Sequence, residues 1–97
     1  MTESDAISFA QVEHNGSAQQ FELRVGSLLC LLQYHLKNGK MIVYHTEVPP
    51  PIQNRGLAER MTRTALEYAR TAKLKVEPRC PYTAAFVRRH REYSDLL

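Results

Sequence analysis

The sequence of 97 residues predicts an α+β fold, with a mixed, mostly antiparallel sheet of about five strands and two main helices. Three observations support this prediction. The first half alternates apolar and polar residues at the period of a strand and contains two Asn-Gly turns. The second half repeats apolar residues at the period of a helix, and a further short strand and helix follow it. We therefore expect the order β-β-β-β-α-β-α in one domain over residues 1–97, with residues 1–6 disordered.

The first half is expected to fold as an antiparallel meander. Asn15-Gly16 and Asn38-Gly39 are strong hairpin signals, because both central residues of such a turn need a positive φ. Leu28 to Leu32 is a continuous apolar run, which predicts a central strand covered on both faces. The strands are expected at residues 8–14, 20–25, about 28–32 and 41–48.

The second half predicts a helix, a strand and a helix. Apolar or small residues recur at helical spacing from Asn54 to Ala72. Lys73 to Glu77 reads as a short strand that a proline ends, and Pro81 suits the first turn of a helix running to about His90. The helical crossover makes the last strand parallel to its neighbour. The terminal residues Leu96 and Leu97 are expected to dock on the domain.

Composition excludes several classes of protein. The chain is 43% hydrophobic and 24% charged, with a net charge of +3, which is ordinary for a globular domain. Cys30 and Cys80 are too few for a disulfide framework or a cysteine-rich zinc site, so we expect no metal and a reducing, cytoplasmic compartment. No apolar run reaches the ~20 residues of a membrane span. A concentrated basic stripe with exposed aromatic pairs is missing too, so neither a membrane nor a nucleic-acid partner is expected.

The stretch from His45 to Ala58 is the most informative part of the chain. It reads as a strand, a stiff loop with three prolines, and a small-residue turn that opens the long helix. The turn leaves backbone N–H groups free at the positive end of a helix dipole, and Gly56 and Ala58 allow an anion to approach them closely. The stretch therefore predicts a phosphate-bearing ligand.

Residues 53–58 resemble the Gln/Arg-x-x-Gly-x-Gly/Ala signature of the GNAT acetyltransferases, whose loop holds the pyrophosphate of acetyl-coenzyme A. Residues 45–49, 65–70, 80–82, 90 and 92–96 strengthen the resemblance and are similar to the small YidJ-like branch, also described as N-acetyltransferase domain-containing proteins. The resemblance runs from about Phe21 to the C-terminus. It implies acetyl-coenzyme A as the cofactor and a protein, peptide or polyamine amine as the acceptor.

The resemblance also implies roles for residues. The edge of the fourth strand would pair with the pantetheine arm, the N–H groups from Asn54 to Ala58 would hold the pyrophosphate, and Cys80 and Tyr82 would lie near the thioester. Two departures stand out. Asn54 and Arg55 replace a glycine-rich middle, so an extra side chain must point away from the phosphates. Where many larger GNAT enzymes place a proton-donating tyrosine in the last helix, the comparable region offers Phe86 and Val87, which cannot donate a proton. The expected coenzyme-binding residues are Glu47, Val48, Gln53, Asn54, Arg55, Gly56, Leu57, Ala58, Cys80, Tyr82 and Phe86.

The candidate catalytic residues are Cys80, His45 and Tyr82. Cys80 stands before a proline-started helix, and a helix N-terminus lowers a thiol pKa, so this thiol could donate a proton to the departing coenzyme or take the acetyl group itself. A buried thiol that only packs, and a structural His45, are the alternatives. The sequence thus predicts an acetyl-coenzyme A-dependent N-acetyltransferase, monomeric or weakly dimeric. A coenzyme A-binding or sensing module with little transferase activity and a small nucleic-acid binder are the rival predictions.

Overall fold

The five strands form one mixed sheet in the order β1-β2-β3-β4-β5. The computed structural model describes residues 2–97. The first four strands are antiparallel neighbours, and β5 runs parallel to β4, as the helical crossover requires. The predicted α+β fold with a mostly antiparallel sheet is confirmed. The strands are β1 (Val12–Asn15), β2 (Gln20–Val25), β3 (Leu28–Lys37), β4 (Lys40–Glu47) and β5 (Lys75–Pro78).

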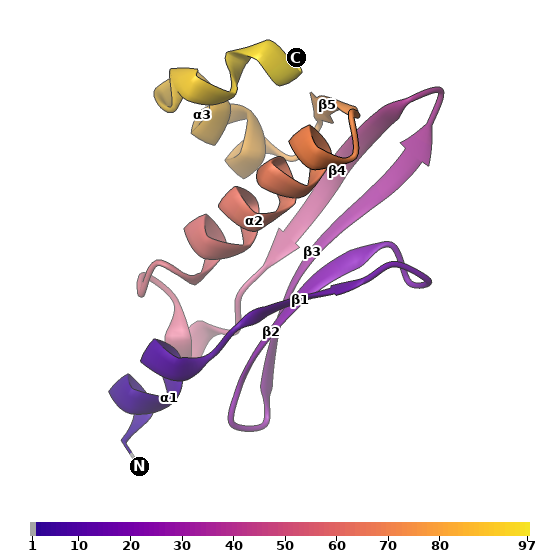
Figure 1. Cartoon of the computed structure of the whole chain (residues 1–97). Helices are drawn as coiled ribbons and strands as arrows, with labels where there is room; N and C mark the ends of the chain where they lie inside the picture. Colours follow the sequence, from indigo (N-terminus) through magenta and orange to yellow (C-terminus); the bar gives the residue numbers. More distant parts are fainter. Residues whose placement is uncertain (1) are drawn as a thin grey trace.

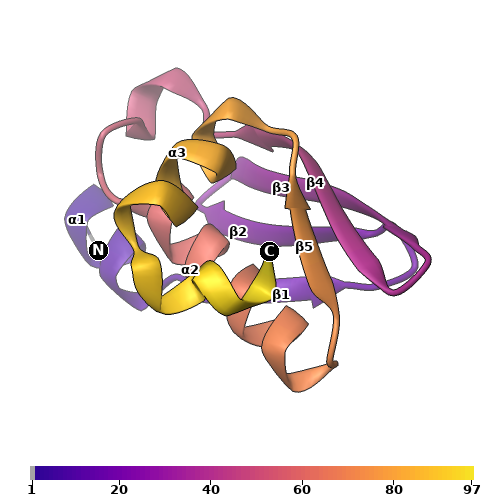
Figure 2. The ribbon, with the colours of Figure 1, turned by 90° about the horizontal axis from the view of Figure 1, so that it is seen from above.

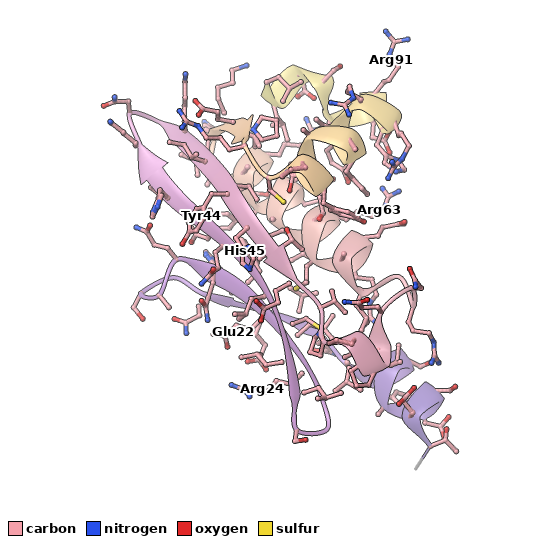
Figure 3. The ribbon with its side chains drawn as sticks, turned by 180° about the vertical axis from the view of Figure 1, so that it is seen from behind. Glu22, Arg24, Tyr44, His45, Arg63 and Arg91 are labelled. Carbon is pink, nitrogen blue, oxygen red and sulfur yellow. The ribbon has the colours of Figure 1, made fainter. Side chains whose placement is uncertain are left out.

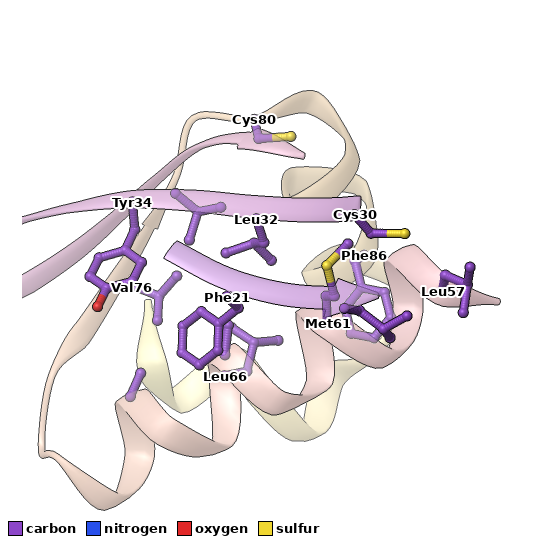
Figure 4. Close-up of a cluster of buried hydrophobic side chains, with 14 of the residues drawn as sticks. Phe21, Cys30, Leu32, Tyr34, Leu57, Met61, Leu66, Val76, Cys80 and Phe86 are labelled. Carbon is purple, nitrogen blue, oxygen red and sulfur yellow. The ribbon is translucent and has the colours of Figure 1, made fainter. Parts of the chain in front are cut away.

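The helices gather on one face of this sheet (Figures 1 and 2). The long helix α2 lies across the strands and buries Met61, Ala65 and Leu66, which recur at helical spacing. Figure 4 shows Met61 and Leu66 meeting Phe21 and Leu32 of the sheet, all of them at most 1% exposed. The helices are α1 (Glu3–Phe9), α2 (Leu57–Thr71) and α3 (Pro81–Arg89), with 3-10 turns η1 (Pro50–Ile52) and η2 (Arg91–Leu96).

The N-terminal segment departs from the sequence prediction. Residues 3–6, expected to be disordered, belong to α1, and the first strand begins at Val12 rather than Ser8. A capping box fixes the start of α1, since the Asp5 N–H donates to the Thr2 hydroxyl at 3.1 Å and the Thr2 N–H donates to the Asp5 carboxylate. Arg60 of α2 then donates to the carbonyls of Ile7 and Ala10, and Ile7 is buried. The expectation for Met1 lies outside the described residues.

The strand β3 is covered on one face only, so the prediction that Leu28 to Leu32 form a strand covered on both faces is wrong. Cys30, Leu32 and Tyr34 are buried against the helices, whereas Leu29 and Leu31 are only half-buried on the other side. Because the helices occupy one face, the alternate side chains of all strands face away from them. We call this side the open face; it carries Glu22, Leu31, His35, Ile42 and His45.

The strands β4 and β5 part halfway along their length. A register shift leaves Tyr44 as an extra residue, because Gln33 pairs with His45 while Tyr34 pairs with Val43. Pairing with β5 ends at Val43, whose carbonyl accepts hydrogen bonds from the N–H groups of Arg79 and Cys80 at 3.0 and 2.8 Å. Across residues 2–97, the β5-facing edge of residues 44–47 therefore has no strand partner.

The C-terminal turn packs on the domain, and the prediction that both terminal leucines dock holds for Leu96 but not for Leu97. Tyr93 and Leu96 are 4% and 5% exposed, whereas Leu97 is 55% exposed. Within residues 2–97, no helix is both long and apolar enough to cross a membrane.

Candidate functional site

A cavity of about 360 Å³ opens where β4 leaves β5. We call it the helix-side cavity, because it lies between β4 and the N-terminal ends of α2 and α3. Its volume is within the range of small-molecule and cofactor sites. It is lined by Thr46, Val48, Gln53, Asn54, Gly56, Leu57, Ala58, Glu59 and Tyr82.

The floor of this cavity is a turn with unpaired backbone donors. Asn54 and Gly56 both adopt positive φ, 62° and 78°, and Gly56 is the N-cap of α2 without a side-chain cap. The first N–H that closes a bond is that of Arg60, to the Gly56 carbonyl at 3.1 Å. The N–H groups from Asn54 through Glu59 have no partner in the part of the chain that the structure describes. Such a row of donors at a helix N-terminus binds anions.

Gly56 suits this position because of its backbone conformation, and it leaves open space beside the main chain. An L-residue at φ 78° is strained, and a Cβ placed at Gly56 would meet no atom within 4 Å, so the space beyond it is open. An anion can therefore reach the main chain at this position.

Two side chains of the turn are tied to neighbouring elements. Gln53 donates to the Val48 carbonyl at 2.9 Å, which ties the turn to β4. Arg55 points toward α1, where it donates to Glu3 at 3.0 Å and to Ser4 at 3.1 Å. The Arg55 side chain thus points away from the cavity, as the sequence predicts for one of the two residues, whereas Asn54 lines it. The carboxylate of Glu59 is at the rim, and Arg63 pairs with it at 3.2 Å and offsets its charge.

Cys80 lies behind the cavity wall as the N-cap of α3. The thiol is 6% exposed, and its Sγ donates to Thr46 Oγ1 at 3.6 Å. Burial alone would raise the pKa of Cys80. Once the thiol is ionised, however, its sulfur accepts hydrogen bonds from the backbone N–H of Thr83 and the hydroxyl of Thr46, and these outweigh burial and hold this pKa below its usual value. Burial without such donors raises the pKa of the other thiol, Cys30.

Tyr82 is a phenol that stays protonated at neutral pH. Partial burial, together with the charge of Glu59, raises its pKa above the usual tyrosine value. Because it lines the helix-side cavity, its hydroxyl can donate a hydrogen bond or a proton there.

His45 and Glu47 lie on the open face, across the strand from the cavity. Thr46 between them lines the cavity, and side chains alternate along a strand. His45 Nε2 is 3.2 Å from Glu47 Oε1, and both side chains are about half exposed, 47% and 58%. Figure 3, seen from behind, shows His45 with Tyr44 and Glu22 on this side of the sheet.

The structure brings only part of the predicted set to the cavity. Phe86 is fully buried in the core, with its ring 4.1 Å from that of His90, and Arg55 faces α1. Cys80 reaches the cavity only through Thr46. The backbone of Glu47 remains on the free edge of β4 although its side chain points away. The predicted residues that line the cavity are Val48, Gln53, Asn54, Gly56, Leu57, Ala58 and Tyr82.

Two lining residues escaped the sequence analysis. Thr46 could have been found from strand periodicity, because it precedes Val48 by two positions and so shares its face. Glu59 sits in the first turn of α2, where an acidic side chain reads as ordinary dipole compensation. No sequence signal marks it as part of a site.

Comparison with known proteins agrees with this geometry. The model of the GCN5-related N-acetyl-transferase family matches residues 20–96. Protein NATD1 of Xenopus tropicalis is 29% identical over 87 residues, covering 87% of this chain and 80% of that protein. Protein NATD1 of Gallus gallus is 34% identical over 82 residues, covering 80% and 74%, and that of Homo sapiens is 33% identical over 82 residues, covering 80% and 72%. The predicted resemblance is confirmed, and the chain belongs to the GCN5-related N-acetyl-transferase family.

Proposed function

We propose that the protein binds acetyl-coenzyme A in the helix-side cavity and transfers the acetyl group to an amine. One observation carries the proposal: the unpaired N–H groups from Asn54 through Glu59 open into the same cavity as the free edge of β4. The family supports an acetyltransferase-like function. The donor and the acceptor are our proposal.

The residues present fit the two ends of the coenzyme. The N–H row would bind the pyrophosphate, because backbone donors at a helix N-terminus favour negative charge. The unpaired edge of residues 44–47 would hydrogen-bond the pantetheine amides as a neighbouring strand does. The apolar surfaces of Val48 and Leu57 would contact its methylene segments.

Acetyl-coenzyme A supplies its acetyl group as a thioester when bound. In the transfer a nitrogen–carbon bond forms to the amine, and the carbon–sulfur bond breaks. His45, oriented by Glu47, would take the proton that the amine loses. Tyr82, kept protonated by its raised pKa, would give a proton to the departing sulfur, and Cys80 is the alternative donor through Thr46. The N–H groups around the Tyr44 bulge would stabilise charge on the carbonyl oxygen.

A coenzyme A-binding module without transferase activity is the second candidate. Two observations favour it. Phe86, at the position where the resemblance leads us to look for a proton-donating tyrosine, is buried in the core, and the Cys80 thiol does not line the cavity. Both candidates predict the same ligand, so only product formation separates them.

The test combines calorimetry with product analysis. We expect acetyl-coenzyme A to bind with a measurable heat and thiol release to accompany acetylation of an amine pool detected by mass spectrometry. His45→Gln and Glu47→Gln should both lower the rate, while Glu22→Gln, which removes a carboxylate elsewhere on the open face, should not. Binding without any acetylated amine supports the module, and no binding overturns the proposal.

The cellular setting is also a proposal. Both cysteines are free thiols within the described chain, which fits the cytoplasmic location expected from composition. The expected monomer or weak dimer stays a prediction.

A further inference from the structure

We propose that the acetyl acceptor is an amine that also carries a negative charge and an apolar or aromatic body, bound in a second cavity on the open face. This inference rests on the proposed function and names the substrate class of its acceptor side. We call the second cavity the open-face cavity; it measures about 660 Å³ and is lined by Gln19, His35, Leu36, Lys37, Ile42, Tyr44 and Arg79.

The two cavities meet the same break in the sheet from opposite faces. Tyr44, the bulged residue, lines the open-face cavity, and Thr46, two positions further along β4, lines the helix-side cavity. Arg79 also lines the open-face cavity, and its backbone N–H is one of the two that bond the Val43 carbonyl where the strands part. An amine in the open-face cavity thus lies across the sheet from a thioester held along the β4 edge. Figure 3 shows Tyr44 and His45 together on this side.

The wall of the open-face cavity offers a flat apolar surface. The rings of His35 and Tyr44 stack with centroids 4.4 Å apart and planes at 18°. Tyr44 is 41% exposed, so its ring leaves apolar area facing solvent. A flat or branched apolar group would cover this surface, as aromatic rings commonly stack in offset pairs.

The charge around the open-face cavity is positive. Lys37 and Arg79 line it, and Lys40 follows at the hairpin that closes it. Arg79 is paired with Glu77, but no ion pair among residues 2–97 engages Lys37 or Lys40. The hydrogen bond with Arg79 is the main cause that lowers the pKa of Glu77, and the charges of Lys40 and Lys37 lower it further. Both lysine charges therefore lie near Glu77 and Arg79.

This charge selects among acceptors. A polyamine or a lysine-rich peptide would be repelled by Lys37 and Lys40, whereas a carboxylate or phosphate on the acceptor would be attracted. The open-face carboxylates do not reverse the balance. Glu22 accepts hydrogen bonds from Asn15 and Gln20, Glu47 pairs with His45, and Glu77 is paired with Arg79. None of these three, nor Glu13 beside Glu22, lines the open-face cavity. The inference therefore favours an anionic amine over the protein or polyamine acceptor expected from the sequence.

The test compares amines that differ by one charge. L-Phenylalanine and phenylethylamine share a ring and an amine, but only the first carries a carboxylate; spermidine represents the polyamines. With saturating acetyl-coenzyme A and equal concentrations of neutral amine, we expect kcat/KM for phenylalanine to exceed that for phenylethylamine by about tenfold, the effect of one charge near a protein surface. Lys37→Gln should shrink this ratio several-fold. Arg24→Gln, a lost charge on the same face but outside the cavity, should leave it unchanged.

A preference for phenylethylamine or spermidine, or a ratio that Lys37→Gln leaves intact, would overturn the inference while the proposed function stands. Absence of any heat with acetyl-coenzyme A would instead defeat the proposed function. In that event, nuclear magnetic resonance of the labelled protein without coenzyme decides the matter for the open-face cavity. Shifts of Tyr44 and His35 with phenylalanine but not with phenylethylamine support it, and equal or absent shifts overturn it.

Discussion

Replacement of Gly56 separates the backbone requirement of the turn from its role as an anion site. Gly56 has a φ of 78°, and a Cβ there meets nothing within 4 Å, so alanine costs only backbone strain, about 1–2 kcal/mol of unfolding free energy. Gly39 has a φ of 76° and equally open surroundings at the β3–β4 hairpin, which makes it a matched control. Urea unfolding should report similar losses for Gly56→Ala and Gly39→Ala.

The glutamate variant adds a negative charge to the same backbone strain. Two unit charges about 4 Å apart repel by about 1 kcal/mol in water and about 4 kcal/mol near a protein surface. Gly56→Glu should therefore bind acetyl-coenzyme A at least about tenfold more weakly than Gly56→Ala, while Gly39→Glu binds like Gly39→Ala. Calorimetry at low and high salt should show the penalty shrinking as the charges are screened. Equal affinity of Gly56→Glu and Gly56→Ala would refute the placement of the pyrophosphate on this turn.

Three further predictions concern the thiols, α1 and the C-terminal turn. Because the pKa of Cys80 is lowered, the pH midpoint of its alkylation by iodoacetamide should lie below that of free cysteine. Cys30, which is fully buried and has a raised pKa, should stay unmodified in the folded protein. Mass spectrometry across a pH series checks both results. Arg60→Ala removes two charged hydrogen bonds to the carbonyls of Ile7 and Ala10. The free energy of unfolding should fall by about 1–3 kcal/mol, and amide hydrogen exchange in α1 should accelerate. Unchanged exchange would contradict the role of Arg60 in holding α1 on the domain. Hydrogen bonds from Arg70 lower the pKa of Asp95. The carboxylate therefore stabilises the fold above its unfolded pKa, and this stabilisation is lost as the pH falls through its folded pKa. Asp95→Asn should lower Tm at pH 7 but not in strong acid.

The sequence predicted the elements whose signals are local. The alternation of β2 and the helical stripe of α2 each follow from residues a few positions apart, and the parallel β5 follows from chain connectivity. The prediction that β3 is covered on both faces was wrong, because an apolar run does not reveal how many layers cover a sheet. The start of α1 has a readable capping box, but its anchoring depends on Arg60, about fifty residues away.

The candidate site likewise has a part that the sequence predicts and a part that it does not. The turn around Gly56 and its unpaired donors were predictable, because helix geometry leaves those N–H groups without partners wherever the turn occurs. The separation of His45 from Tyr82 was not, because the bulge at Tyr44 shifts the alternation of β4 by one position. The position of a bulge depends on pairing with β3, and nothing near Tyr44 in the sequence announces it.

The break between β4 and β5 has its own cause in three residues. Pro78 is the last residue paired with β4 and has no N–H to extend the ladder, so the strand stops there. Pro81 fixes the first turn of α3 only three positions later, which carries the chain off the sheet. The Tyr44 bulge meanwhile increases the local twist of β4 and turns its edge away from β5. Two prolines and one bulge thus expose a single stretch of backbone to both faces of the sheet, and two proposed substrates can meet there without a separate acceptor domain.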